Sequence, residues 1–473
     1  MDAAQIILQH INERDEELST IAKQIWDNPQ VALQETYAAR LLADTLAAAG
    51  FDISWGAGGM STAFIAEWGG GGSPTIGFLG EYDALPGLSQ ELSSTKSPIE
   101  SGGPGHGCGH NLYGTACLGA VLALQKAMQS LAIPGTIRFY GCPAEETLVG
   151  KTFMARDGVF DDLDAALTWH PGASNVVWNG SSLAMNSFRV NFYGVAAHAG
   201  GLPWLGRSAL DGVMLMDAGV NYMREHVPPE SRIHSVVTRG GDAPNVVPAY
   251  AQVWYFARAP KRAQVEEIYR WMQDIAQGAA LMTGTRCEIE FLTGCYDLLP
   301  NQVISDLLYE KMAAVDDMRF TEKERDYARE LQASFPPGSV QRGFDWMQQS
   351  TSQTLGKAAM ADPLWEGVFH HSPTPPLLGG STEVADVSWI TPTAQMITTC
   401  WPLGTPAHSW QAVASTGSSI GAKGMLFAAK TMALAGCELL VDADLLAAAK
   451  AEFLAARGDS PYVTPLPPEA SPK

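Results

Sequence analysis

The stretch TIRFYGCPAEE, residues 136–146, places a strand-like apolar run directly before two adjacent glutamates. Comparable apolar runs stand at 75–79 and 165–169, and helical patterns near 112–131 and 150–157 lie between the runs. Strands that alternate with helices in this way are typical of an α/β domain with a largely parallel sheet. The pattern therefore predicts that residues 1–185 form the first part of such a domain.

A different order of elements follows this first part. The next strand-like and helical patterns have the order β-α-β-β-α-β, at 187–195, 206–226, 232–240, 250–258, 262–281 and 286–293. This order is that of the ferredoxin-like split unit, and its length suits a separate domain. We expect an inserted ferredoxin-like domain at 186–297.

The rest of the chain is expected to return to the first domain, as its second part at 298–458. Amphipathic helices are expected at 2–27 and 34–49, further helices near 301–314, 321–334 and 415–440, and a strand at about 391–400. A Pro- and Gly-rich stretch at 335–380 is expected to be irregular. Residues 459–473 contain five prolines and are expected to form a loose tail.

Composition narrows the class of protein. The chain has 473 residues, of which 46% are hydrophobic and 17% charged, with a formal net charge of −20. So acidic a surface repels phosphate backbones and anionic lipid headgroups, so neither nucleic acid nor a membrane is expected as a partner. No signal peptide or transmembrane helix is expected. Seven cysteines, spread from Cys108 to Cys437, suit a reducing compartment, and a cytoplasmic location is expected.

The loop GHGCGHN, residues 105–111, carries a cysteine and a histidine two residues apart among glycines. Thiolate and imidazole groups at this spacing can reach one metal centre, and they suit zinc and other first-row metals. A glycine-rich loop with a buried cysteine and incidental histidines is an equally good interpretation of these seven residues alone.

The ends of the predicted strands favour the metal interpretation. In an open α/β sheet, ligands gather beyond the carboxyl ends of the strands. Three successive strands deliver acids and a histidine to this edge, at Asp83, Glu145, Glu146 and His170. One carboxylate could cap a helix, but divalent cations explain the whole set better. One of two adjacent glutamates could bind metal while the other takes a proton from metal-activated water, which predicts hydrolysis of an amide-like bond.

Five motifs, taken together, carry a family resemblance. They are GEYDALP at 80–86, GHGCGHN at 105–111, CPAEE at 142–146, TWHP at 168–171 and AHAGG at 197–201. The set resembles the two-metal aminoacylase and carboxypeptidase G-type metallopeptidase family. Within that family it resembles the amidohydrolase branch that includes the plant auxin-conjugate hydrolases. The similarity runs from about residue 20 to 440, in the order that the family shows.

The resemblance implies a fold, a cofactor and a ligand set. The fold is a mixed sheet flanked by helices, with the inserted ferredoxin-like domain serving as a lid or dimerisation domain. The cofactor is two divalent transition metal ions per chain, manganese or zinc. Cys108 would bridge the two ions, with His110 and Glu146 beside it on one side. His170 would hold the other ion, and His408 would supply a late ligand.

The resemblance also implies roles for residues that do not bind metal. Glu145 would be the general base, and Asp83 would orient a ligand. His198 would stabilise the oxyanion, often from across a dimer interface, although it could be an ordinary loop histidine. Asn245 and Arg258 would hold the substrate carboxylate, although Arg258 could instead pair with a surface acid.

The expected activity is hydrolysis of an N-acyl or N-aroyl amino acid. The leading substrate is p-aminobenzoyl-glutamate, which would give p-aminobenzoate and glutamate. A dipeptidase or an aryl-amine deaminase on the same scaffold, and a non-catalytic binding subunit, are the alternatives. The expected assembly is a homodimer, or a heterodimer with a related A-type subunit. Asn111, Gly200, Gly201 and Glu383 depart from the family pattern, which leaves the chemistry in place and weakens the substrate assignment.

Overall fold

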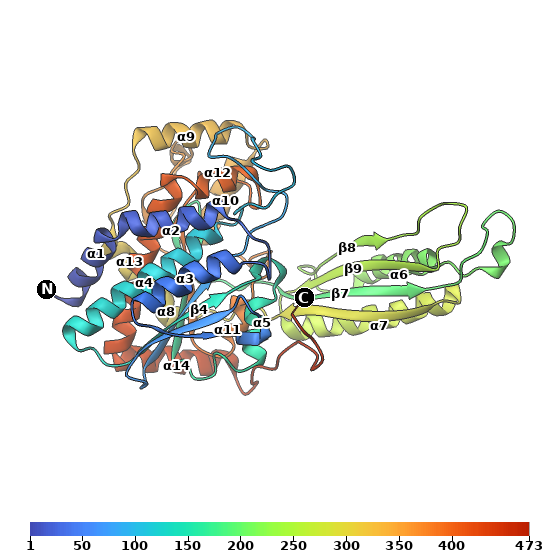
Figure 1. Ribbon diagram of the computed structural model, residues 1–473, viewed down its shortest axis with the longest axis horizontal. Coiled ribbons are helices and arrows are strands. Elements are labelled where there is room, and N and C mark those ends of the chain that lie inside the picture. The colour runs from blue at the N-terminus through green and yellow to red at the C-terminus, as the bar shows by residue number, and fades with distance from the viewer. Residues whose placement is uncertain (473) are drawn as a thin grey trace.

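A computed structural model describes residues 1–472. The molecule is elongated and has two parts, a larger helix-rich part and a long projection (Figure 1). We call the projection, residues 184–295, the arm, and the remainder the body. The N-terminus lies at the end of the body far from the arm, and the C-terminus lies where arm and body meet.

The body is built on one mixed sheet. Its strand order is β1-β2-β4-β3-β5-β12-β6-β11, and the central strands β4, β3, β5 and β12 are parallel to their neighbours within this group. The strands are β1 (Asp52–Trp55), β2 (Phe64–Gly69), β3 (Thr75–Glu81), β4 (Thr136–Cys142), β5 (Ala165–Gly172), β6 (Asn175–Trp178), β11 (Val368–Phe369) and β12 (Thr393–Thr399). The predicted α/β class is therefore confirmed.

Helices cover both faces of this sheet. They are α1 (Ala3–Glu13), α2 (Asp15–Asp27), α3 (Thr36–Ala48), α4 (His110–Leu131), α5 (Gly150–Arg156), α8 (Gln302–Val315), α9 (Glu322–Ala333), α10 (Ser339–Ser350), α11 (Val384–Ser388), α12 (Trp410–Thr416), α13 (Ser419–Val441) and α14 (Ala443–Arg457). Because side chains alternate along a strand, Phe78 packs into the core under α4 and α13, whereas Leu79 packs into the core beside α5 and α11.

Helix α13 is long and apolar enough to span a membrane by length and composition. However, 83% of its most apolar 18-residue window is buried inside the structure. Gly119 of α4 lies close to Ala429 of α13, where a Cβ on the glycine would stand 3.3 Å from the alanine Cβ. Helix α13 is therefore a core helix of the body, packed against α4.

The arm contains a second sheet with the strand order β10-β7-β9-β8, and every neighbouring pair is antiparallel. Its elements are β7 (Ala184–Tyr193), α6 (Ala209–Met223), β8 (Arg232–Arg239), β9 (Tyr250–Ala259), α7 (Arg262–Thr283) and β10 (Arg286–Cys295). Alternate residues of β7, among them Phe188, Val190 and Phe192, pack with α6 and α7 into a core of their own. The predicted β-α-β-β-α-β order is confirmed, while the domain boundaries stay predictions.

Several local predictions are wrong. The region 2–27 forms two helices that are separated at Arg14, and the stretch 335–380 contains α10 and β11. The segment expected to be a loose tail packs on the body instead. Its Leu466 is buried, and the Tyr462 hydroxyl donates to Asp386 at 2.9 Å. Apolar side chains between the prolines pack against the surface of the body, a contact that composition alone does not predict.

Candidate metal centre

The carboxyl ends of three neighbouring strands and the start of one helix meet at a single place. Glu81 ends β3 and lies opposite Cys142 at the end of β4. The short 3-10 helix η2 (Glu145–Thr147) follows β4, and His170 lies near the end of β5. Helix α4 begins at His110, directly after Gly109, whose left-handed backbone (φ +81°) turns the chain into the helix. Parallel packing of the strands thus brings the predicted residues together.

Cys108 stands between two groups of potential ligand atoms. The first group consists of Cys108, His110 and His170, and the second of Cys108, Glu146 and His408. Within each group, the potential ligand atoms all lie within 4.8 Å of one another. The Cys108 Sγ is 3.3 Å from the His170 Nε2. The resemblance placed His110 with Glu146, whereas the structure groups His110 with His170. One sulfur atom shared by two groups is an arrangement suited to two cations.

Asp83 fixes the orientation of one of these histidines. Its Oδ1 lies 2.8 Å from the His110 Nδ1, and its Oδ2 accepts the backbone N–H of Glu146 at 2.9 Å. Because a carboxylate can only accept, the His110 Nδ1 donates this hydrogen bond, and the Nε2 on the other side of the ring is the nitrogen available to bind a metal ion. This is the hydrogen bond that metal-binding histidines commonly make to a carboxylate.

The unused polar atoms point to a cation. Within residues 1–472, the buried His110 Nε2 and Glu146 Oε1 have no hydrogen-bond partner. Buried polar atoms are nearly always satisfied, so orphaned atoms call for an explanation. One sulfur, three imidazole nitrogens and a carboxylate form a donor set that suits zinc and related first-row cations. The residues therefore fit a divalent metal pair.

Burial perturbs the acids of the centre. Burial, together with the charges of Glu81 and Glu146, raises the pKa of Glu145 well above its ordinary value. Burial and the Asp83 charge raise the pKa of Glu146 to about 7, although His110 opposes the shift. Carboxylates crowded in this way favour the approach of positive charge.

The two remaining histidines differ in environment. Burial and the nearby His110 lower the pKa of His170 to about 4, and its Nδ1 donates to the Pro171 carbonyl at 2.7 Å. The His170 Nε2 therefore turns a lone pair toward Cys108. His408 lies in the loop before α12, with a half-exposed ring and a left-handed backbone (φ +52°). Its Nε2 is 3.4 Å from the Glu146 Oε2, so His408 forms the solvent-facing edge of the centre.

The structure separates Arg258 from the other two predicted arm residues, His198 and Asn245. Arg258 pairs with Met185 near the body end of β9, and its buried Nε has no hydrogen-bond partner among the described residues. His198 and Asn245 are exposed, and they lie beyond the far ends of β7 and β9, where an isolated bridge joins His198 to Val246.

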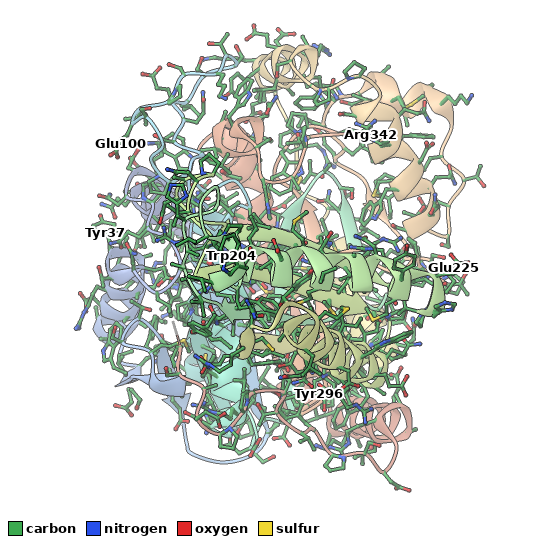
Figure 2. All side chains as sticks on the ribbon, turned by 90° about the vertical axis from the view of Figure 1, so that its right-hand side faces the viewer. Tyr37, Glu100, Trp204, Glu225, Tyr296 and Arg342 are labelled. Carbon is green, nitrogen blue, oxygen red and sulfur yellow. The ribbon has the colours of Figure 1, made fainter. Side chains whose placement is uncertain are left out.

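Figure 2 looks at the molecule from that far end, where Trp204 is 68% exposed. The arm projects away from the body (Figure 1). In this conformation a single chain therefore brings Arg258 to the body end of the arm and keeps His198 and Asn245 away from the metal centre.

Sequence reasoning assigned no role at the site to three charged residues of the body. Glu81, Lys151 and Glu383 are buried together beside the centre. Glu81 ends the same strand that delivers Asp83, a signal that could have identified it. Lys151 gives no comparable signal, because its partner Glu383 is 232 positions away in the chain.

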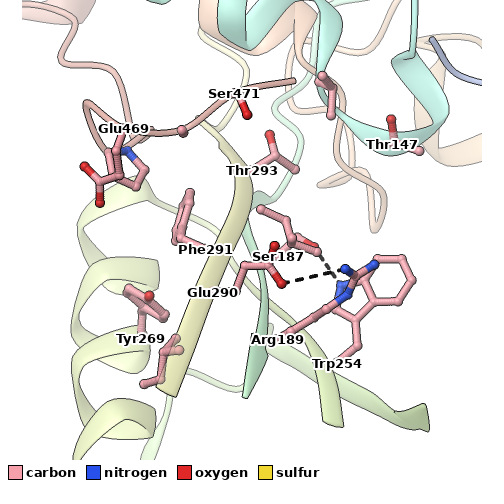
Figure 3. A pocket seen from close by; sticks show the side chains of 15 residues that line it. Thr147, Ser187, Arg189, Trp254, Tyr269, Glu290, Phe291, Thr293, Glu469 and Ser471 are labelled. Carbon is pink, nitrogen blue, oxygen red and sulfur yellow. Dashed lines mark hydrogen bonds and ion pairs between the residues drawn. The ribbon is translucent and has the colours of Figure 1, made fainter. Parts of the chain in front are cut away.

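A groove of about 610 Å³ lies where the arm, the body and the C-terminal segment meet (Figure 3). It is lined by residues of β7, β9, β10 and α7 and by Thr147, Val149, Pro467, Glu469, Ala470 and Ser471. Arg189 pairs there with Glu290 at 3.7 Å, and the Trp254 indole donates to Ser187 at 2.9 Å. None of the metal-centre residues lines it, so the groove is separate from the chemistry.

Comparison with known proteins places the chain among metallopeptidases. Residues 77–401 match the model of peptidase family M20/M25/M40. The B-type chain of the p-aminobenzoyl-glutamate hydrolase of Escherichia coli is 41% identical over 457 residues, covering 96% of this chain and 95% of that protein. The Xaa-Arg dipeptidase of Mus musculus is 32% identical over 308 residues, covering 63% of this chain and 68% of that protein.

Solved structures share the fold. An aminobenzoyl-glutamate utilization protein from Klebsiella pneumoniae has a TM-score of 0.57 at 20% identity, covering 88% of this chain and 97% of its own. A dinuclear metal binding peptidase of the M20 family from Bacillus subtilis has a TM-score of 0.53 at 15% identity, covering 89% and 98%.

Proposed function

The chain belongs to peptidase family M20/M25/M40, and we propose that this hydrolase cleaves the amide bond of p-aminobenzoyl-glutamate. The products would be p-aminobenzoate and glutamate. The observation that carries the proposal is the pair of ligand groups that share Cys108 beside the partly buried Glu145. The relative named for this substrate, which aligns over 96% of the chain, supports the choice of substrate.

The metal ions are proposed to be manganese or zinc, bound by Cys108, His110, Glu146, His170 and His408. When bound, such a pair lowers the pKa of a water molecule and polarises the scissile carbonyl. Asp83 orients the His110 ring and fixes the backbone of Glu146, so that both side chains face the metal site.

Glu145 is proposed to move the proton. It belongs to neither of the two groups that share Cys108 but lies with Glu81 and His110 in a third group of potential ligand atoms, so its carboxylate stands beside the metal centre, where it would act on water. It would take a proton from the attacking water and deliver it to the leaving nitrogen of p-aminobenzoyl-glutamate, so that the amine leaves neutral. Burial keeps bulk water away from this transfer.

The arm is proposed to hold the substrate. Glutamate carries two carboxylates, and the planar guanidinium of Arg258 can bind one of them through two hydrogen bonds. Its unpartnered Nε and its position at the body end of the arm support this role. Asn245 and His198 would contribute from the far end of an arm, after closure or from a second chain.

The assembly is proposed to be a dimer, either of two copies or with an A-type chain. The A-type chain of the p-aminobenzoyl-glutamate hydrolase of Escherichia coli is 30% identical over 230 residues, covering 46% of this chain and 52% of that protein. A cytoplasmic location is also proposed. The seven cysteines form no disulfide in the described part of the chain, which agrees with a reducing compartment. Cell fractionation would test the location.

A substrate panel tests the activity. Chelator-stripped protein would be reloaded with Mn²⁺ or Zn²⁺ and assayed on p-aminobenzoyl-glutamate, on other N-acyl amino acids and on Xaa-Arg dipeptides, with ammonia release as a readout for deamination. We expect p-aminobenzoyl-glutamate to have the highest kcat/KM. A preference for Xaa-Arg dipeptides would favour the dipeptidase alternative, which the second relative suggests. No turnover of any compound by metal-loaded protein, alone or with an A-type chain, would contradict the proposal.

A further inference from the structure

A fully buried lysine lies behind the metal centre. Lys151, in the first turn of α5, has an exposed fraction of 0%, and its two acidic partners Glu81 and Glu383 are 1% and 0% exposed. The Lys151 Nζ is 2.8 Å from the Glu81 Oε1 and 3.1 Å from the Glu383 Oε1. An unpaired buried charge is very costly, so the lysine and the two glutamates act as one unit.

Glu81 connects this unit to the metal centre. Its Oε1 contacts Lys151, while its Oε2 lies 3.4 Å from the His110 Nε2. Potential ligand atoms of Glu81, His110 and Glu145 all lie within 4.8 Å of one another. One oxygen of Glu81 is thus held by an ammonium group, and the other faces the nitrogen that would bind metal and the proposed base.

The other end of the unit is anchored to the backbone. The Glu383 Oε1 accepts the backbone N–H of Lys151 at 2.7 Å as well as its ammonium. A Cβ added at Gly150 would stand 1.9 Å from the Pro143 carbonyl oxygen and 3.0 Å from the Glu383 Oε1. Only glycine therefore permits this close approach, which fixes the start of α5 against Glu383 and sets the direction of the lysine.

We propose that Lys151 is a positioning residue of the hydrolytic site, which holds Glu81 so that one carboxylate oxygen remains beside His110 and Glu145. The inference rests on the proposed function, because it assumes a metal centre at Cys108. Lys151 also offsets the charge of Glu81. Without the ammonium group, Glu81 would be a further uncompensated anion next to Glu145 and Glu146. Its carboxylate would then be free to turn toward the metal ions and to compete with the attacking water molecule for them.

Substitution of Lys151 by methionine tests the proposal. Chelator-stripped protein would be loaded with Co²⁺, whose absorption spectrum reports the ligands of the ion without any substrate. We expect Lys151→Met to change this spectrum and to lower kcat about 10- to 100-fold with little change in KM, the range found when groups that support metal ligands are lost. Lys151→Arg, which keeps the charge, should retain more activity than Lys151→Met.

A double variant separates positioning from mere stability. In Lys151→Met/Glu81→Gln the uncompensated carboxylate is gone, so we expect the cobalt spectrum to move back toward that of the parent and kcat to rise above that of Lys151→Met. Lys430→Met is the matched control, because it removes a buried lysine that pairs with Asp317 on the surface of the body. It should lower the melting temperature and leave the spectrum and kcat unchanged.

The outcomes decide clearly. A Lys151→Met protein with the parent cobalt spectrum and parent kcat overturns the proposal, whatever its melting temperature. If that variant does not fold, Glu81→Gln decides, since it keeps the lysine and the size of the side chain. We expect Glu81→Gln to change the cobalt spectrum and to lower kcat. If its spectrum and kcat equal those of the parent chain, the proposal is overturned. A parent chain that binds Co²⁺ but cleaves no compound of the panel contradicts the proposed function, while the spectra still decide the role of Lys151.

Discussion

Cys108 faces both groups of ligand atoms, so its removal affects two ions at once. We expect Cys108→Ala to lose most of the transition metal that the parent chain binds, up to two ions per chain. Elemental analysis of chelator-free protein measures this content. Cys108→Asp is the control, because a carboxylate can also bridge two cations and should retain more metal. Full metal content in Cys108→Ala would refute the bridging role.

Glu145 and Glu146 are neighbours in the chain with different surroundings. Only Glu146 belongs to a group that contains Cys108. Glu145→Gln keeps the shape of the side chain but cannot take a proton, so we expect a kcat at least ~10²-fold lower with normal metal content. Glu146→Gln should instead lose metal. Single-turnover assays with matched metal analysis distinguish the two, and near-normal turnover of Glu145→Gln would place the base elsewhere.

At this scale the sequence predicts residues that end parallel strands, and it misses those that support them. The side chains of Asp83, Glu146 and His170 meet because parallel strands end at one edge. Lys151 and Glu383 meet because α5 and α11 pack together, and no local pattern encodes that contact. The distance of His198 from the centre was also beyond sequence reasoning, because motifs do not report the direction of the arm.

Among the elements, long periodic segments are predictable and short edge segments are not. The elements of the arm follow from alternation and helical spacing, because most of them bury one face in a core, although β8 buries only Ile233. Strand β11 has two residues and β6 has four, too few for a period to show. Helix α10 was hidden by the glycines and prolines around it, although Phe344 and Met347 bury one of its faces.

Helix α9 is tied to α13 by a single acid whose contribution depends on pH. Burial works in the opposite direction, but hydrogen bonds from Lys423, Ser419 and Thr321 lower the pKa of Glu324 to about 2, from an ordinary value of 4.5. A carboxyl with a lowered pKa in the folded state stabilises the fold above its unfolded pKa, and this contribution is lost as the pH falls toward 2.

We therefore expect Glu324→Gln to lower the free energy of unfolding at pH 7, and the difference from the parent to shrink between pH 5 and pH 3. Urea denaturation at several pH values measures it. Glu330→Gln, at an exposed position of the same helix, is the control and should show little difference at any pH. A constant difference for Glu324→Gln across this range would exclude the linkage.

At the scale of the whole molecule, the question is how residues at the far end of the arm can contribute to a metal centre in the body. The arm projects from the body (Figure 1), and its far end carries His198 and Asn245. A donor at that end can reach a metal centre only if the arm closes on its own body or if a second chain presents it. We expect His198→Ala to lower kcat on the order of 10²-fold, the effect of losing one oxyanion donor, with normal metal content. Kinetics and elemental analysis on the same sample test this.

Mixing two inactive variants distinguishes closure within a chain from donation by a second chain. Glu145→Gln chains keep His198, and His198→Ala chains keep Glu145. If the donor comes from the partner, a hybrid dimer contains one complete site, and the mixture should recover part of the parent activity. Exchange of subunits must be shown separately by pull-down of differently tagged chains. If the chains exchange and no activity returns, His198 does not act across the interface, and the arm must close on its own body for His198 to contribute at all.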